Sequence, residues 1–414
     1  MKKPKFFFLL IVLFVLFLPT LLLANVNFRV LTYNVLNFSE TTGIDRIQYF
    51  QTVLDAINPD IIIMQEMINE EGAELMLDSL NSNGQEYAGA EFINGYDTDN
   101  MFYYRTSIVT FISQDTIHTA LRDISEYVVN IGGDEIRFYS CHLKAGQGST
   151  NRNKRLAEVT ILRNRLNNLP EGTEFIIIGD MNFYYSNEPG YQKFIADEDN
   201  NIGRAEDLIG EVGYWHDNKD YAQVHTQSTR TTQFGGGASG GLDDRFDFIL
   251  VSYGINDSAR IDYVDSSYKA FGNDCNHLNM SINDSVNGVV SQNVANALYY
   301  ASDHLPVYAD FISLSDPYCT DEDTGTFLNG IKLHQNYPNP VYNSTVIQYK
   351  IKDNMNQNAT IKIFNLRGEL IRTVEGNHGK AELDVSDFST GIYFYQFKNE
   401  NFNKIKKMIV IHLD

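Results

Sequence analysis

The sequence predicts an α/β body followed by a small all-β domain, and two patterns carry this prediction. Short continuous apolar runs, as at 61–64 and 175–178, are typical of strands buried on both faces, and segments with apolar residues at helical spacing separate them. Such alternation is typical of sheets covered by helices. Beyond residue 331 the apolar runs are separated by Asn, Gly, Asp or Ser, as in a small β-sandwich.

The elements of the body follow one another from residue 28. Strands are expected at 28–33, 60–66, 136–143, 175–179, 245–252 and 302–311, a hairpin at 101–112, and helices at 47–57, 75–80 and 156–169. Asn58-Pro59 should end the first helix, because the residue before a proline avoids helical backbone angles.

Length and charge indicate two folded units. The chain has 414 residues, of which 43% are hydrophobic, enough for a substantial core and more than one ordinary domain. Residues 28–314 hold 18 Lys and Arg against 41 Asp and Glu, whereas residues 331–414 hold 11 against 8. The acidic body argues against charge-driven wrapping of nucleic acid, but not against a phosphate substrate that is reached through a bound cation.

The N-terminus has the layout of a secretory signal peptide over residues 1–24. Three lysines precede an apolar run from Phe6 to Leu18, and the small residue Ala24 follows. An uncleaved anchor is the alternative, and in either case the body is exported.

Two further segments are predicted to be connections. Residues 315–330 are acidic and rich in small residues, which predicts a linker. Residues 235–241 form a flexible glycine-rich loop by composition. A phosphate-binding loop is the alternative, but no strand leads directly into this segment and no Lys-Ser/Thr pair closes it.

The three cysteines set no disulfide framework. Cys275 and Cys319 are the pair from which one bridge is expected, if any forms. Cys141 lies inside an apparent strand and is expected to be a buried thiol.

Polar residues stand at or just beyond the apolar strands of the body. They are Asn34, Glu66, His142, Asp180 with Asn182, Asp247, and Asp303 with His304. Taken alone, the Gly-Asp-Met-Asn motif at 179–182 fits a structural strand end as well as a catalytic one. Together the residues predict a shared site, because buried carboxylates are costly unless they bind a cation or pair with one another.

The motifs around these residues carry a family resemblance. They are Leu-Thr-Tyr-Asn34, Met-Gln-Glu66, Ser-Cys-His142, Ile-Gly-Asp180-Met-Asn182, Arg-Phe-Asp247-Phe-Ile and Ser-Asp303-His304-Leu-Pro-Val. With all six in order, residues 28–314 resemble the endonuclease/exonuclease/phosphatase superfamily, which includes pancreatic deoxyribonuclease, abasic-site endonucleases, inositol polyphosphate phosphatases and neutral sphingomyelinases. The resemblance implies a four-layer α/β sandwich, in which two mixed sheets pack face to face with helices outside.

The resemblance also implies a metal site. Glu66 would hold a divalent cation, with Asn34 and Asp303 nearby. Mg²⁺ is the expected ion, with Mn²⁺ or Ca²⁺ as alternatives, because few protein ligands and several waters suit a hard cation.

Catalytic roles carry over by position in the same way. Asp180 would orient and deprotonate the attacking water, and Asn182 would fix its geometry. His304, held by Asp247, would donate to a phosphoryl oxygen, and His142 would be a second donor or the acid for the leaving group.

Three weaker assignments follow from the same resemblance. Tyr96 and Arg122 stand where deoxyribonuclease-like members contact substrate phosphate, although plain surface roles fit them as well. Asp97 or Asp99 is expected to orient His142.

Residues 331–414 have a resemblance of their own. The motifs Leu-His-Gln-Asn-Tyr-Pro-Asn-Pro340, Ile-Phe-Asn-Leu-Arg-Gly368 and Ser-Thr-Gly-Ile-Tyr-Phe394, with the closing Lys-Lys-Met-Ile-Val-Ile, look like the type A sorting domain of the bacterial type IX secretion system. This implies the type IX machinery as partner and export through the periplasm and outer membrane of a Gram-negative bacterium, to the cell surface or the medium. A carbohydrate-binding sandwich is the alternative, and no stable protein partner is predicted.

The function expected from both resemblances is that of a secreted, metal-dependent phosphodiesterase, with an extracellular nuclease as the leading form. A phospholipid or sphingomyelin phosphodiesterase is the alternative, with the aromatic pairs Tyr184-Tyr185 and Tyr214-Trp215 as candidates for entering lipid. A sugar or inositol phosphate phosphatase and a non-catalytic surface adhesin on the same fold are further alternatives.

Overall fold

The computed structural model describes most of the chain. The described residues are 25–233, 235–255, 260–314, 331–333, 336, 339, 341–351, 359–377, 380–399 and 402–411. The chain divides into two compact units, Met1–Pro317 and Tyr318–Asp414, each considered by itself below. The predicted signal peptide and linker, and Cys319 of the expected disulfide pair, lie outside the described residues.

The first sheet of the body has seven strands. Its order is β11 (Ile261–Tyr263), β13 (Val307–Ser313), β1 (Val26–Phe38), β2 (Ile61–Met67), β4 (Asp99–Arg105) and β3 (Tyr87–Gly89), with β12 (Lys269–Ala270) also paired to β13. Strands β1 and β2 run parallel, whereas β13 and β4 are antiparallel to their neighbours, so the sheet is mixed.

The second sheet has six strands. Its order is β5 (Val109–Ile117), β6 (Ile124–Ile131), β7 (Asp134–His142), β8 (Phe175–Asp180), β10 (Asp247–Ser252) and β9 (Ala205–Asp207). Only β7 and β8 pair in parallel, and the long helix between them makes that crossover.

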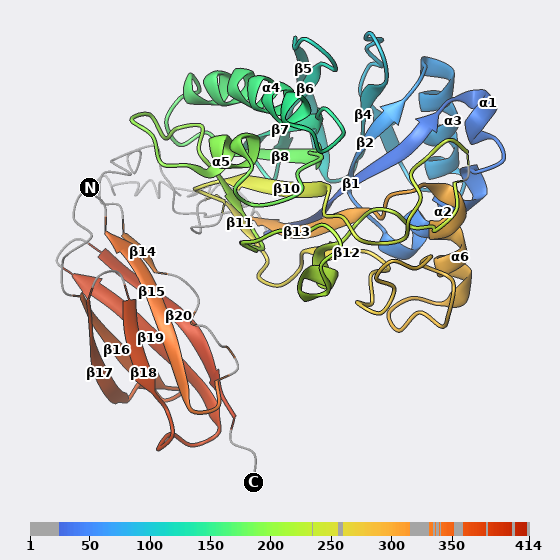
Figure 1. Cartoon of the computed structure of the whole chain (residues 1–414). Coiled ribbons are helices and arrows are strands. Elements are labelled where there is room, and N and C mark those ends of the chain that lie inside the picture. The colour runs from blue at the N-terminus through green and yellow to red at the C-terminus, as the bar shows by residue number, and fades with distance from the viewer. Residues whose placement is uncertain are drawn as a thin grey trace, which may run out of the picture. The chain divides into compact units, whose positions relative to one another are not determined.

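Helices cover the outer faces of both sheets (Figure 1). Apolar residues of α2 (Ile47–Ile57), α3 (Glu70–Asn81) and α6 (Gln292–Ala301) pack on the first sheet, and those of α4 (Ser149–Asn167) and α5 (Pro189–Ile195) pack on the second. The short helices α1 (Glu40–Gly43) and η1 (Lys219–Val224) lie in connections.

A third apolar cluster fills the space between the sheets. It joins strand residues of the first sheet, such as Ile63 and Val307, to strand residues of the second, such as Ile178 and Ile249. The order of layers is therefore helix, sheet, sheet, helix, and the predicted four-layer sandwich is confirmed.

The predicted hairpin at 101–112 is wrong. Strands β4 and β5 flank the turn at 106–108, but β4 pairs with β2 and β3 while β5 pairs with β6, in the other sheet. The chain crosses between the sheets here. A turn between two apolar runs has the same local pattern in both cases.

The second unit consists of strands, which confirms the prediction of a small all-β domain. One sheet has the order β14 (Ile331–Leu333), β15 (Ser344–Ile351) and β18 (Lys380–Asp384). The other has the order β17 (Leu370–Gly376), β16 (Ala359–Asn365), β19 (Gly391–Asn399) and β20 (Phe402–Val410). A shared apolar cluster contains Ile347 of the first sheet and Tyr395 of the second, so the two sheets pack together.

The two cysteines among the described residues differ in exposure. Cys141 is buried as a free thiol in β7, as expected, and Cys275 is exposed. Among the helices that the structure describes, none is long and apolar enough to cross a membrane.

Candidate active site

Three of the predicted site residues stand side by side in the second sheet. His142 at the end of β7 pairs with Asp180 at the end of β8, and Asp180 pairs with Asp247 at the start of β10. Neighbouring residues of adjacent strands lie about 5 Å apart, so strand register alone brings an imidazole and two carboxylates together.

Gly179 makes this close arrangement possible. Its φ is +134°, and an added Cβ would lie 2.1 Å from the carbonyl oxygen of Cys141 on β7. Only glycine avoids that clash with a fixed backbone atom, which explains the glycine directly before Asp180.

The first sheet contributes residues from three segments, β1, β2 and the entrance to β13, which are neighbours in the sheet. Asn34 and Glu66 lie near the ends of β1 and β2, and the segment that leads into β13 carries Asp303 and His304. The pairing of β1 with β2 shifts register after Asn34, and Glu66 has a left-handed backbone with φ of 64°. Such irregularities redirect side chains and are frequent at functional sites.

Asn34 joins the two sheets. Its Nδ2 donates to Oε1 of Glu66 at 3.0 Å and to Oδ2 of Asp180 at 3.1 Å, while its Oδ1 accepts from the backbone N–H of Leu36 at 3.0 Å. In this arrangement Asn34 orients two carboxylates and keeps its own oxygen on the backbone.

Asp180 accepts most of the hydrogen bonds at the centre of the site. The backbone N–H of Asn182 donates to its Oδ1 at 3.1 Å, and Nδ2 of Asn182 donates to the same oxygen at 2.8 Å. Asn182 also has a left-handed backbone, with φ of 53°. Burial raises the pKa of Asp180 to about 7, although the positive charge of His304 opposes this shift.

His304 and Asp247 form an ion pair across the two sheets. Nδ1 of His304 lies 2.8 Å from Oδ2 of Asp247, and both side chains are buried. Burial alone would lower the pKa of His304, but the negative charges of Asp247, Asp180 and Asp303 outweigh it and hold the pKa well above its usual value. Nε2 of this histidine lies 3.8 Å from Oδ2 of Asp180.

Comparisons with known proteins place both units of the chain in families. Residues 31–304 match the family model described as "Endonuclease/Exonuclease/phosphatase family", which spans most of the body, the first five motifs and the sixth as far as His304. The chain belongs to the endonuclease/exonuclease/phosphatase family. Residues 335–411 match the model described as "Secretion system C-terminal sorting domain", so the second unit is a sorting domain typical of exported proteins. A comparison with curated proteins finds no significant match.

Several solved structures are similar to the family domain. A zebrafish (D. rerio) TDP2 humanized by 14 mutations is 16% identical, with 69% of this chain and 98% of that one covered and a TM-score of 0.45. The human Nocturnin catalytic domain with bound sulfate is 16% identical, with 70% and 96% covered and a TM-score of 0.44. A Bacteroides thetaiotaomicron protein of the same family is 16% identical, with 70% and 96% covered and a TM-score of 0.43.

His142 faces the two carboxylates, but no described residue orients its ring. Its Nε2 lies 3.5 Å from Asp180 and 3.8 Å from Glu66, whereas its buried Nδ1 has no hydrogen-bond partner among the described residues. Contrary to the expectation, neither Asp97 nor Asp99 donates to or accepts from His142. Asp97 pairs with Arg122, and Oδ1 of Asp99 accepts from Gly95, while its buried Oδ2 has no partner among the described residues. Burial, together with the nearby positive charges, lowers the pKa of His142 well below its usual value. A neutral imidazole can donate one hydrogen bond, but it carries no spare proton for a leaving group.

The two residues expected to contact phosphate differ in their placement. Arg122 is mostly buried, pairs with Asp97 at 2.8 Å, and is near enough to His142 for its charge to lower the pKa of that histidine. Tyr96 is 94% exposed. The charge of Arg122 therefore acts on a residue of the candidate site, whereas no contact of the Tyr96 side chain with that site is seen among the described residues.

Gln227 is a site residue that the sequence motifs did not indicate. Its amide nitrogen lies 2.6 Å from Nε2 of His304 and 3.3 Å from Oδ2 of Asp303. No local pattern around residue 227 marks it, because it reaches the site only through an isolated β-bridge to His304.

The glycine-rich loop also reaches the site. The backbone N–H of Ala238 donates to Oδ2 of Asp303 at 2.6 Å, and a Cβ on Gly237 would lie 2.8 Å from Cγ of Asp303. The loop therefore uses a backbone N–H to bind the Asp303 carboxylate. In a phosphate-binding loop, such N–H groups would point at an anionic ligand instead.

The donor set fits the hard divalent cation that the family implies. Burial raises the pKa of Glu66, and the negative charge of Asp303 adds to this effect, which a cation held by these carboxylates would offset. Two carboxylates with few other protein donors suit an ion that keeps several waters. Glu66 and Asp303 are the residues that would hold it.

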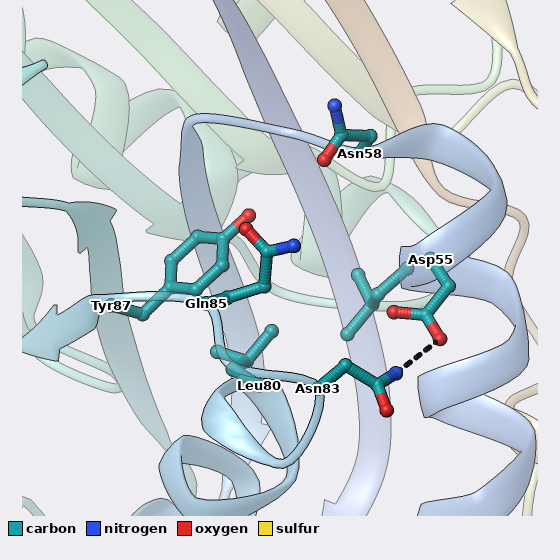
Figure 2. A pocket seen from close by; sticks show the side chains of 7 residues that line it. Asp55, Asn58, Leu80, Asn83, Gln85 and Tyr87 are labelled. Atoms are coloured by element: carbon teal, nitrogen blue, oxygen red, sulfur yellow. Dashed lines mark hydrogen bonds between the residues drawn. The ribbon is translucent and has the colours of Figure 1, made fainter. Parts of the chain in front are cut away.

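A separate pocket lies away from these residues (Figure 2). It has a volume of about 240 Å³ and lies beside the segment that precedes β2, at the opposite end of that strand from Glu66. Asn83 donates to Asp55 across it at 2.9 Å. Its lining contains a single ionisable carboxylate, so it offers no catalytic set.

Proposed function

We propose that the body hydrolyses phosphodiester bonds with the help of a divalent cation, and that the protein acts outside the cell as a nuclease. The observation that carries the proposal is Asp180, which accepts hydrogen bonds from Asn34 and Asn182 and faces the His304–Asp247 pair. Asp180 supplies a base, His304 a cationic hydrogen-bond donor and Glu66 a carboxylate that could hold a cation. Hydrolysis of a phosphodiester needs groups of these three kinds.

Each residue of the site would have its own role in the hydrolysis. Asp180, held in one orientation by Asn34 and Asn182, would take a proton from the attacking water. Protonated His304 would donate from Nε2 to a phosphoryl oxygen as its negative charge grows, and Asp247 would keep it protonated. A cation at Glu66 and Asp303 would supply Lewis-acid stabilisation of the phosphate and of the leaving oxygen.

The preference for nucleic acid over lipid rests on the aromatic pairs. Trp215 is fully buried, Tyr184 packs edge-on against Phe246, and Tyr185 stacks on Tyr214. Of the residues proposed to enter lipid, Tyr214 is the exposed one, at 50%. One exposed ring is a small contact for a membrane surface, whereas Arg122 and Lys144 near His142 are suited to a phosphate backbone.

The sorting domain supports the cellular part of the proposal. Such domains direct proteins to the type IX secretion machinery, so the substrate is expected outside the cell, as for an enzyme that degrades extracellular nucleic acid.

A substrate panel tests the proposal. DNA, RNA, sphingomyelin and bis(4-nitrophenyl) phosphate would be offered with Mg²⁺ and then with chelator. We expect turnover of DNA or RNA that requires the cation. Preferred hydrolysis of sphingomyelin would move the assignment to the lipid enzymes, and lack of turnover on every substrate would favour the adhesin.

Variants connect the activity to the site. Asp180→Asn and His304→Ala should each lower kcat by roughly 10² or more. Glu66→Gln should raise the Mg²⁺ concentration needed for activity, whereas Glu71→Gln, a change at an exposed glutamate of α3, should not. Near wild-type activity in Asp180→Asn would rule out the proposed base.

A further inference from the structure

Three metal-ligating side chains lie together outside the catalytic set. His216 comes from the segment before η1, and Asp243 and Asp244 precede β10. One ligand atom from each of the three lies within 4.8 Å of the other two. Nδ1 of His216 lies 2.8 Å from Oδ1 of Asp244 and 3.8 Å from Oδ2 of Asp243, so the imidazole nitrogen faces both carboxylates.

The surrounding structure holds these ligands in place. Tyr184 and Tyr214 pack edge-on against the His216 ring, with centroids 5.8 and 6.1 Å away. The backbone N–H of Asp217 donates to the carbonyl oxygen of Asp243 at 2.9 Å, which ties the two segments together. The side chains of His216, Asp243 and Asp244 are 30%, 19% and 12% exposed, so an ion could still enter.

Positive charge compensates the two carboxylates of the cluster only in part. Among the described residues, neither Asp243 nor Asp244 pairs with a lysine or arginine, and the Asp243 carboxylate accepts no hydrogen bond. Two partly buried carboxylates on consecutive residues repel each other unless a cation lies between them. The imidazole of His216 lies within hydrogen-bond distance of Asp244, and the charge of His304 also acts on Asp244, but among the described residues no such contact neutralises Asp243.

We infer that His216, Asp243 and Asp244 form a second cation site, distinct from the one at Glu66. One imidazole nitrogen with two carboxylates suits a divalent transition metal such as Mn²⁺ or Zn²⁺ better than Mg²⁺ or Ca²⁺, which prefer oxygen ligands alone. A bound ion would clamp the segment at 214–217 to the start of β10. Asp247, three residues beyond Asp244, lies on that strand, so the clamp would steady the partner of His304.

A count of bound Mn²⁺ tests the inference in the purified chain. Free Mn²⁺ would be measured by electron paramagnetic resonance during titration of Glu66→Gln, in which cation binding at the proposed catalytic site is weakened. We expect one remaining site. Adding Asp243→Asn should weaken it at least about tenfold, as should His216→Gln, because each removes a ligand. Asp220→Asn removes one charge from an exposed position of the neighbouring η1 and should leave the affinity unchanged.

The chain contains a reporter for the position of the ion. Trp215 is the only tryptophan and directly precedes His216. Co²⁺, which quenches indole fluorescence at short range, should quench Trp215 in Glu66→Gln and lose this effect in Asp243→Asn.

The inference is overturned if Glu66→Gln binds no Mn²⁺ with a Kd below about 1 mM, a weak limit for extracellular cation sites. It is overturned equally if folded Asp243→Asn and His216→Gln bind as tightly as their parent. Neither measurement uses substrate, so failure of the nuclease proposal would not change the result.

Discussion

Oδ2 of Asp247, at the start of β10 in one sheet, lies 2.8 Å from Nδ1 of His304, which precedes β13 in the other. Both side chains are buried, so the packing of the two sheets determines the distance between a cationic donor and its counter-ion. The other oxygen of Asp247 has no hydrogen-bond partner among the described residues. The pair therefore depends on this single contact.

Replacement of Asp247 should reveal that dependence. Asp247→Asn keeps the shape but removes the negative charge that holds the pKa of His304 up, so the histidine should lose its proton at lower pH. We expect kcat to fall by roughly 10²–10³ and the alkaline limit of activity to move toward neutral pH. Steady-state kinetics across pH measure both, with circular dichroism as the check on folding. Unchanged kcat at every pH would contradict the assigned role.

The pH profile of the wild-type enzyme should rise through neutrality. Asp180 must be ionised to act as a base, and burial raises its pKa to about 7, so the base is protonated below that pH. His304, with its raised pKa, stays protonated across the same range. We expect kcat/KM to increase between pH 6 and 8 and to fall only at more alkaline pH. A cation at Glu66 would shift the rise toward acid pH, and a profile that falls between pH 6 and 8 would exclude Asp180 as the base.

Gly179→Ala should destabilise the body strongly. The new Cβ would clash with the backbone of Cys141, and neither β7 nor β8 can move away without loss of their pairing. We expect the free energy of unfolding to drop by about 3 kcal/mol, measured by denaturant titration.

Gly84→Ala provides the matched control for that measurement. Gly84 also has a positive φ, of +75°, but an added Cβ would meet no atom within 4 Å. Its replacement should cost only about 1 kcal/mol, the backbone term alone. Equal losses for the two variants would mean that the close approach of β7 and β8 contributes nothing.

Gln227→Ala should lower kcat more than it raises KM. The amide nitrogen of Gln227 lies 2.6 Å from Nε2 of His304 and donates to Oδ2 of Asp303 at 3.3 Å, so this side chain positions both neighbours before substrate arrives. Without it we expect about a tenfold loss in kcat, the usual order for a group that acts through another. Gln227→Glu keeps the length of the side chain but removes the amide donor to Asp303, so it should not restore the rate. No change in kcat in either variant would restrict Gln227 to a structural role.

The site residues differed in how far the sequence could predict them. His142, Asp180, Asp247 and Glu66 each end or begin an apolar run, which is a local pattern that can be read without a structure. Gln227 and Ala238 lie in irregular segments, and they contact His304 and Asp303 only because the chain folds back over the site. The expected contact of Asp97 or Asp99 with His142 was wrong: Asp97 pairs with Arg122, and Asp99 accepts only from Gly95 among the described residues.

By itself, the sequence determined the class of fold, the all-β second unit and the family of the body, because apolar periodicity and the six motifs are local properties of the chain. Only the tertiary structure decided which strands share a sheet. Strands β4 and β5 lie in different sheets, although the turn between them has the sequence pattern of a hairpin. The tertiary structure also brought His216 to Asp243 and Asp244, more than twenty residues away in the chain. Contacts of that kind depend on strand register and on the packing of sheets, which no short stretch of sequence specifies.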